Sequence, residues 1–354
     1  MVERLGSMSV RLPSRTWGAY GRDMDAVAGL LDGPRARGAF LLRSLLAPPW
    51  SMRIEDEAPL TLVPVVRGSA WIGMDAGPRT DEPPLEAQLD EGDVALVRGP
   101  RHYTVADSPG TAPQMVSDAV GACRAIGDAP SPLVDLGVRT WGNDPDGPTV
   151  LLTGTYPLDG EVGGRLLSVL PPLVVLRRGD LDADLVSLLA REVSQDRPGQ
   201  EAVLDRLLDV LLIGALRAWL DRGEAPGWYR ADADPVVGHA LRLMHHDPAR
   251  AWTVESLARA VGLSRAAFSR RFTELVGEPP MGYLTGWRLT LAADLLLEPG
   301  ATVGSVARQV GYGTPFALSA AFTRVRGMSP TAHRERAGAG AVAGEEAEPG
   351  AGVA

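Results

Sequence analysis

One short segment of the chain combines residue types that can contact a nucleic acid. Arg265, Arg270 and Arg271 place three guanidinium groups close together, and Ala266 and Ser269 lie between them. A guanidinium group can donate two hydrogen bonds to the edge of a guanine, and it can also pair with a phosphate. The segment therefore predicts contact with DNA, unless it is the solvated face of an ordinary helical hairpin.

Helical spacing decides which of these side chains share a face. Phe268 and Phe272 are four residues apart and are expected to face a core. Ala266, Ser269 and Arg270 then lie on the opposite face, where a groove of DNA would meet them. Such a helix needs neighbouring elements that hold it at the surface.

Those elements are found in a sequence repeat around the segment. The offset is 49 residues and becomes 50 after one inserted residue. Matching residues include Thr253 and Thr302, Gly262 and Gly311, Ser264 and Thr314, Phe272 and Phe322, and Pro280 and Pro330. In the second copy the predicted DNA contacts are Thr314, Phe316, Ala317, Ser319 and Arg324.

Each copy has the parts of a helix-turn-helix unit. Thr253 and Thr302 are expected N-caps of short helices, which end where Gly262 and Gly311 allow a sharp turn. A second helix follows, and in the second copy Pro315 stands at its first position. The second helix of such a unit lies in the major groove of DNA.

Residues 235–336 resemble the DNA-binding domain of the AraC/XylS family of bacterial transcription regulators. The resemblance is carried by "WTVESLARAVGLSRAAFSRRFTELVGEPPMGYL" and "VGYGTPFALSAAFTRVRGMSPTAHR", one stretch in each copy. It implies two units that bind successive major grooves of double-stranded DNA, with RNA polymerase as a further partner. It also implies a connecting helix over 281–297, with Leu284, Trp287, Leu291 and Leu295 buried.

The second copy departs from the family pattern at one position. The family usually has an arginine two residues before the last aromatic residue, where the first copy has Arg270. The second copy has Ala320 there, and a methyl group cannot hydrogen-bond to DNA. We therefore expect the first copy to supply most of the base reading, and the second to contribute shape and backbone contacts.

Charge is divided unevenly along the chain, whose net charge is −9. Residues 235–336 contain 12 arginines and 7 acidic residues, a net +5, so the remainder carries −14. The chain contains no lysine, which excludes a Walker-type phosphate loop. This division favours a basic nucleic-acid-binding module attached to an acidic sensor.

The N-terminal half is punctuated by Gly, Pro and Asp, and its short apolar runs predict antiparallel strands in a barrel or sandwich. The stretches "DAVAGLLDGPRARGAFLLRSLLAPPWSMRIED", "GDVALVRGPRHYTV" and "LLSVLPPLVVL" resemble the cupin-type regulatory domain found in a branch of the same family. The resemblance implies a β-barrel that binds a small-molecule effector or a protein partner, followed by helices that form a homodimer. The predicted fold is thus α+β, with two domains.

A metal-dependent enzyme is an alternative interpretation of this half, because many cupins are such enzymes. A cupin metal site needs two or three histidines with a carboxylate, and His102 alone of the five histidines falls in the predicted barrel. We therefore predict no metal, no cofactor and no catalytic residue. His102 and Tyr103 are candidates for an effector pocket, or for a packing role. A protein-interaction module is the third interpretation.

Helical periodicity appears over residues 182–195 and 200–221. Leu204, Leu208, Leu211 and Ala215 form either a dimer seam between two helices or a face packed against the barrel. The sequence leaves both interpretations open.

The remaining features of the sequence indicate the cellular location and the domain boundaries. No apolar run is long enough to span a membrane, and the single cysteine, Cys123, excludes an intrachain disulfide, so we expect a cytoplasmic protein. The expected organisation is a flexible leader (1–23), a cupin-like sensor (24–180), a helical dimerisation or packing segment (181–223), a linker (224–234), the tandem helix-turn-helix domain (235–336) and a disordered tail (337–354).

Overall fold

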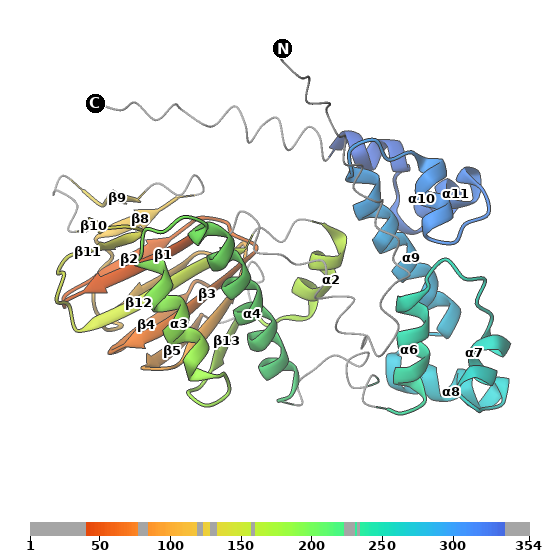
Figure 1. Ribbon diagram of the computed structural model, residues 1–354, viewed down its shortest axis with the longest axis horizontal. Coiled ribbons are helices and arrows are strands. Elements are labelled where there is room, and N and C mark those ends of the chain that lie inside the picture. Colours follow the sequence, from red (N-terminus) through yellow and green to blue (C-terminus); the bar gives the residue numbers. More distant parts are fainter. Residues whose placement is uncertain are drawn as a thin grey trace, which may run out of the picture.

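The computed structural model describes residues 40–76, 84–118, 123–127, 133–156, 160–222, 231 and 234–336. These residues form a β-rich N-terminal half and a helical C-terminal half (Figure 1). The predicted α+β class with two domains is confirmed at this level. The predicted leader, the predicted tail and most of the predicted linker lie outside the described residues.

A seven-stranded sheet forms the centre of the β-rich half. Its neighbouring strands are antiparallel, apart from the parallel pair β1 and β11. In sheet order the strands are β10 (Val134–Gly137), β11 (Thr140–Gly142), β1 (Phe40–Leu46), β12 (Thr149–Tyr156), β3 (Leu60–Arg67), β6 (Val94–Arg98) and β13 (Leu173–Leu176). Six consecutive residues of β3 are buried, because this sheet is covered on both faces.

A second, six-stranded sheet covers one face of the first. Side chains from both sheets, including Val63, Ile72 and Val105, form the core between them together with Trp50, which precedes β2. The strands in order are β5 (Leu85–Asp90), β4 (Ser69–Met74), β7 (Tyr103–Ala106), β2 (Ser51–Ile54), β8 (Met115–Ser117) and β9 (Cys123–Ala125). Over the described strands the hydrogen bonds form two sheets and do not close into one barrel.

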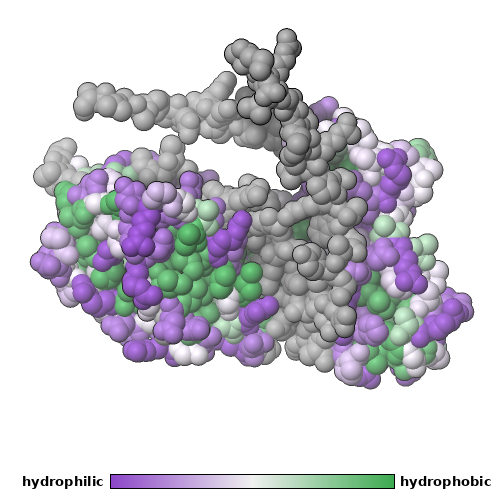
Figure 2. Space-filling view, in the orientation of Figure 1, coloured by the Kyte–Doolittle hydropathy of each residue, from purple (hydrophilic) through white to green (hydrophobic). Residues whose placement is uncertain are grey.

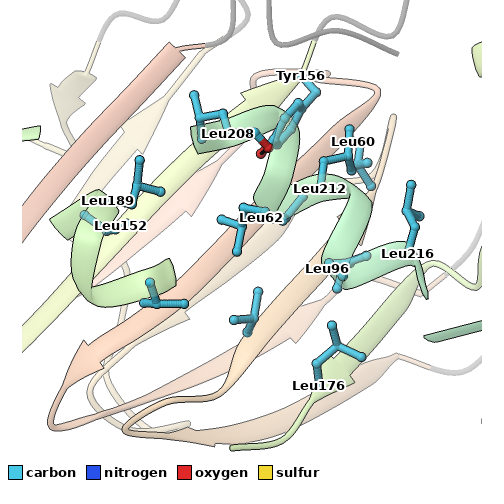
Figure 3. Close-up of a cluster of buried hydrophobic side chains, with 14 of the residues drawn as sticks. Leu60, Leu62, Leu96, Leu152, Tyr156, Leu176, Leu189, Leu208, Leu212 and Leu216 are labelled. Carbon is cyan, nitrogen blue, oxygen red and sulfur yellow. Dashed lines mark hydrogen bonds between the residues drawn. The ribbon is translucent and has the colours of Figure 1, made fainter. Parts of the chain in front are cut away.

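Two helices, α3 (Ala183–Val193) and α4 (Gln200–Leu220), cover the other face of the seven-stranded sheet (Figure 1). Leucines of the helices and of the strands interlock there, as Figure 3 shows for Leu62, Leu152 and Leu212. The hydroxyl of Tyr156 donates a hydrogen bond to the carbonyl of Leu208 at 3.0 Å, so the strand and helix are also joined by a polar contact.

The four residues considered as a dimer seam belong to this core. Leu204, Leu208, Leu211 and Ala215 are all buried against the sheet of their own chain. The four residues therefore pack against the sheet, which was the second of the two interpretations. A contact between two copies of the chain would need another face of α4. Periodicity alone could not separate the two, because it marks a buried face without naming its partner.

The helical half consists of two units joined by one long helix. The helices are α6 (Val237–His246), α7 (Val254–Ala260), α8 (Arg265–Val276), α9 (Pro280–Leu297), α10 (Val303–Gln309) and α11 (Pro315–Arg326). None of the helices in the described residues is long and apolar enough to cross a membrane.

The long helix α9 contributes to both cores of the helical half. Leu284 packs in the core of the first unit, and Leu289 and Leu296 pack in that of the second. The predicted burial is confirmed for Leu284 and Trp287, whereas Leu291 and Leu295 are only half-buried. Because its residues belong to both cores, α9 fixes how the two units sit relative to each other.

Candidate nucleic-acid interface

The first unit begins with a reciprocal cap. The Thr253 side chain accepts a hydrogen bond from the Ser256 N–H at 3.0 Å, and the Ser256 hydroxyl accepts one from the Thr253 N–H at 2.9 Å. Ser264 caps the following helix by accepting from the Ala267 N–H at 3.3 Å. These contacts satisfy N–H groups that a helix start leaves without partners, so the sequence itself sets where α7 and α8 begin.

The second unit repeats these contacts. Thr302 and Ser305 form the same reciprocal cap, and Thr314 accepts a hydrogen bond from the Ala317 N–H. Pro315 stands at the first position of α11, as predicted. The predicted caps of both units are confirmed.

The turns depend on glycine, and most strictly at Gly311. Gly262 and Gly311 have positive φ values of 73° and 82°. At Gly311, a Cβ atom would also lie 2.7 Å from the carbonyl oxygen of Ala249. This turn therefore excludes any side chain on steric grounds as well as conformational ones.

Helix α8 buries one face and exposes the predicted contact face. Phe268 and Phe272 are fully buried and pack edge to face. The opposite face exposes Arg265, Ala266 and Arg270, and half-buries Ser269. Arg270 forms a loose ion pair, 3.9 Å from its Nε to Glu274 Oε1, which leaves its guanidinium available to a ligand.

Arg271 is engaged within the protein. Its guanidinium forms an ion pair with Asp234, including an Nε–Oδ2 distance of 3.1 Å. Asp234 Oδ1 also accepts from the N–H groups of Val236 and Val237, at 3.0 and 2.9 Å. The hydrogen bond from Arg271 is the main cause that holds the pKa of Asp234 below its usual range. Arg271 thus ties α8 to the segment that starts α6, and any DNA contact by Arg271 would compete with this ion pair.

Helix α11 exposes a face of different chemistry. Leu318 and Phe322 are buried, and Phe316, Ala317 and Ala320 are exposed on the outside. The predicted contacts Thr314 and Arg324 are also exposed, and Ser319 is half-buried. Because Phe316 and the alanines have no hydrogen-bonding side chain, the first turns of α11 present an apolar strip where α8 presents arginine.

Sequence reasoning missed a contact between the two halves, in which α2 (Glu161–Val169) packs on α9 (Figure 1). The Asp294 carboxylate accepts hydrogen bonds from the N–H groups of Glu161 and Val162, at 2.6 and 3.1 Å. The N-cap of α2 is Gly160, which has no side chain, so a residue of the other half caps this helix. Burial is the main cause that raises the pKa of Asp294, and the two backbone hydrogen bonds oppose it.

Further contacts surround this cap. Val162 packs on Trp287 in a small buried cluster, and the Arg165 guanidinium lies 6.0 Å from the centre of the Trp287 ring. Arg326, the last residue of α11, forms an ion pair with Glu161. The β-rich half thus touches both α9 and the end of α11.

The candidate effector residues His102 and Tyr103 lie in different surroundings. His102 is half-buried, with Nδ1 3.8 Å from Glu55 Oε1. Tyr103 is buried in the core between the sheets, and this burial raises its pKa. Within the described residues, no group of three or more His, Cys, Asp or Glu side chains is placed to hold a metal ion. The pKa of the Cys123 thiol is raised, chiefly by desolvation, which disfavours the reactive thiolate.

Two family profiles match the chain. A cupin profile matches residues 25–221, and a helix-turn-helix domain profile matches residues 257–336. Among solved structures, the DNA-binding domain of AdpA in complex with a target DNA is 34% identical and covers 29% of this chain and 92% of its own, with a TM-score of 0.28. ToxT from Vibrio cholerae is 11% identical and covers 84% of this chain and 94% of its own, with a TM-score of 0.32.

Two relatives match over most of this chain and nearly all of their own length. An AraC-like transcription regulator of Streptomyces lividans is 33% identical over 88% of this chain and 98% of its own length. Another from Streptomyces antibioticus is 32% identical over 88% of this chain and 99% of its own. These relatives support a regulator over a metal-dependent cupin enzyme. The chain belongs to the AraC-like family of transcription regulators and combines a cupin domain with a helix-turn-helix DNA-binding domain.

Proposed function

We propose that this regulator reads two successive major grooves of one DNA site, with α8 in the first and α11 in the second. Both helices expose one face, and both belong to cores to which the shared helix α9 contributes, which supports the proposal. At 1.5 Å per residue, the 18 residues of α9 span about 27 Å. That length suits two helices that enter grooves about 34 Å apart, one turn of DNA.

The two helices α8 and α11 contribute differently to DNA recognition. On α8, the exposed guanidinium of Arg270 can donate two hydrogen bonds to a guanine, and Arg265 and Ser269 flank it. On α11, the equivalent position is Ala320, so this helix contributes less hydrogen bonding. Base reading is therefore concentrated in the first unit.

Titration of the full-length protein onto a DNA duplex that it selects from a random library tests whether base reading is concentrated in the first unit. Arg270→Ala is expected to weaken specific binding by about 1–3 kcal/mol, whereas Ser319→Ala is expected to change it little. Binding at low and high salt separates base reading from phosphate contacts, because the latter set the salt dependence. Equal losses for the two variants would contradict the proposal.

The cupin half is proposed as the sensor. An effector or a protein partner would bind the barrel-like sandwich, with His102 and Tyr103 as candidate contacts, and RNA polymerase would bind the regulator at the promoter. The contact between α2 and α9 supports coupling, because it joins the sensor to the helix that spaces the two DNA-reading helices. A thermal-shift screen tests the sensor: a dose-dependent rise in Tm with a metabolite supports a small-molecule pocket. If no metabolite changes Tm and a protein partner does, the result supports an interaction module.

A homodimer is proposed through the outer face of α3 and α4. Leu188, Val203 and Val210 are exposed there, and Figure 2 shows apolar residues gathered over this side of the β-rich half. The inner face of α4 is occupied by its own sheet, so these residues are the apolar ones that a second copy could cover.

A further inference from the structure

The side chain of Phe316 is 82% exposed, which is the largest value among the exposed large apolar side chains of the described residues. It belongs to the first turn of α11, directly after the cap formed by Thr314 and the first-position residue Pro315. The core of this unit is built from Leu318 and Phe322 on the opposite face. Core packing therefore does not account for a phenyl ring at this position.

The neighbours of Phe316 limit what the ring can recognise. Ala317 and Ala320 are exposed beside it and end in methyl groups, and Ser319 is half-buried. The repeat aligns Phe316 with Ala266, and Ala320 with Arg270. The strip that offers hydrogen-bond donors in the first unit is thus apolar in the second, and it suits an apolar group on its ligand.

The floor of the major groove offers one apolar group, which is the C5 methyl of thymine. We propose that Phe316 recognises a thymine through this methyl group, and that the second unit selects thymine over cytosine by apolar contact. This inference rests on the proposed function, since it requires α11 to lie in the major groove. A ring on this face would be covered by DNA rather than by another protein.

The test combines a protein substitution with removal of one methyl group from DNA. Full-length protein selects its preferred duplex from a random library, and each thymine of that duplex is then replaced singly by deoxyuridine. Deoxyuridine keeps the base pairing and the carbonyl groups and lacks only the methyl. Kd is measured for the wild type, Phe316→Ala and Val325→Ala, the last being a control on the same helix at a side chain that is 53% exposed.

The wild type and Val325→Ala are expected to lose about fourfold in affinity at one thymine of the second half of the site. Phe316→Ala is expected to bind the thymine and deoxyuridine duplexes equally. Unchanged thermal unfolding of Phe316→Ala shows that the fold is intact, as expected for an exposed side chain.

Two results would overturn the inference alone. In the first, no single deoxyuridine weakens wild-type binding to the selected duplex. In the second, Phe316→Ala loses the same factor on every duplex, which would indicate a role unrelated to the methyl. A failure of the wild type to select any sequence would overturn the proposed function, and the inference with it.

Discussion

The Asp294 carboxylate, on the helix that joins the two DNA-reading units, accepts a hydrogen bond from the backbone N–H of Glu161 in the cupin half at 2.6 Å. It accepts a second from Val162, so it replaces the cap that Gly160 cannot supply. The side chain of Glu161 in turn pairs with Arg326 at the end of α11. One turn of α2 thus touches both α9 and the end of α11.

Removal of this cap is expected to loosen α2 selectively. In Asp294→Ala, the first N–H groups of α2 lose their acceptor, which costs about 1 kcal/mol and raises local opening roughly fivefold. Amide hydrogen exchange should therefore speed up in residues 160–169 and stay unchanged in the sheet. Glu298→Ala, an exposed position at the end of α9, is the matched control. Equal exchange in both variants would show that the contact does not hold α2.

The ion pair between Asp234 and Arg271 is expected to give a pH-dependent stability. The pKa of Asp234 is lowered from its ordinary value of 3.8, so the folded state favours the ionised form. The stabilisation is complete above the unfolded pKa and is lost as pH falls through the folded value. Urea unfolding should therefore show Asp234→Asn less stable than wild type at neutral pH, with a gap that closes in acid. A gap independent of pH would contradict this account.

The same ion pair predicts how Arg271 differs from Arg270. Arg271→Ala is expected to lower stability and leave the order of preferred DNA sequences unchanged, because its guanidinium faces Asp234.

Gly311→Ala is expected to destabilise the helical half more than Gly327→Ala does. Both glycines have positive φ, which costs an alanine about 1–2 kcal/mol. A Cβ at Gly327 meets nothing within 4 Å, whereas one at Gly311 meets the Ala249 backbone at 2.7 Å. Urea unfolding followed by circular dichroism compares the two. Equal losses would show that the backbone relaxes around the added methyl.

Adjacent residues of α4 should respond in opposite ways. Leu211 is buried against the sheet, so Leu211→Ala is expected to cost about 2–5 kcal/mol of stability. Val210 is 52% exposed, so Val210→Asp should leave stability nearly unchanged and reduce self-association in sedimentation equilibrium. Unchanged self-association in Val210→Asp would place any dimer contact elsewhere.

Local signals made the helical half predictable. These signals act over a few residues, and they include the cap Thr253, the turn at Gly262 and the spacing of Phe268 and Phe272. Each signal has a counterpart in the second copy of the repeat. The short apolar runs of the N-terminal half also formed strands, as predicted, and β3 (Leu60–Arg67) is one of them.

Long-range partners were not predictable in the same way. Asp294 and Glu161 are 133 residues apart, and neither belongs to a periodic pattern. Asp234, the partner of Arg271, falls in what the composition predicted to be a linker. The inner face of α4 was recognised as buried, but periodicity could not say that its partner is the sheet.

Footprinting of the full-length protein on the DNA upstream of its own gene, with Arg270→Ala beside the wild type at two salt concentrations, tests base reading by the first unit. The wild type is expected to protect about two turns on one face of the duplex. Arg270→Ala should lose that protection and keep only weak, salt-sensitive binding. An identical footprint from both proteins would contradict the claim that the first unit reads bases through Arg270.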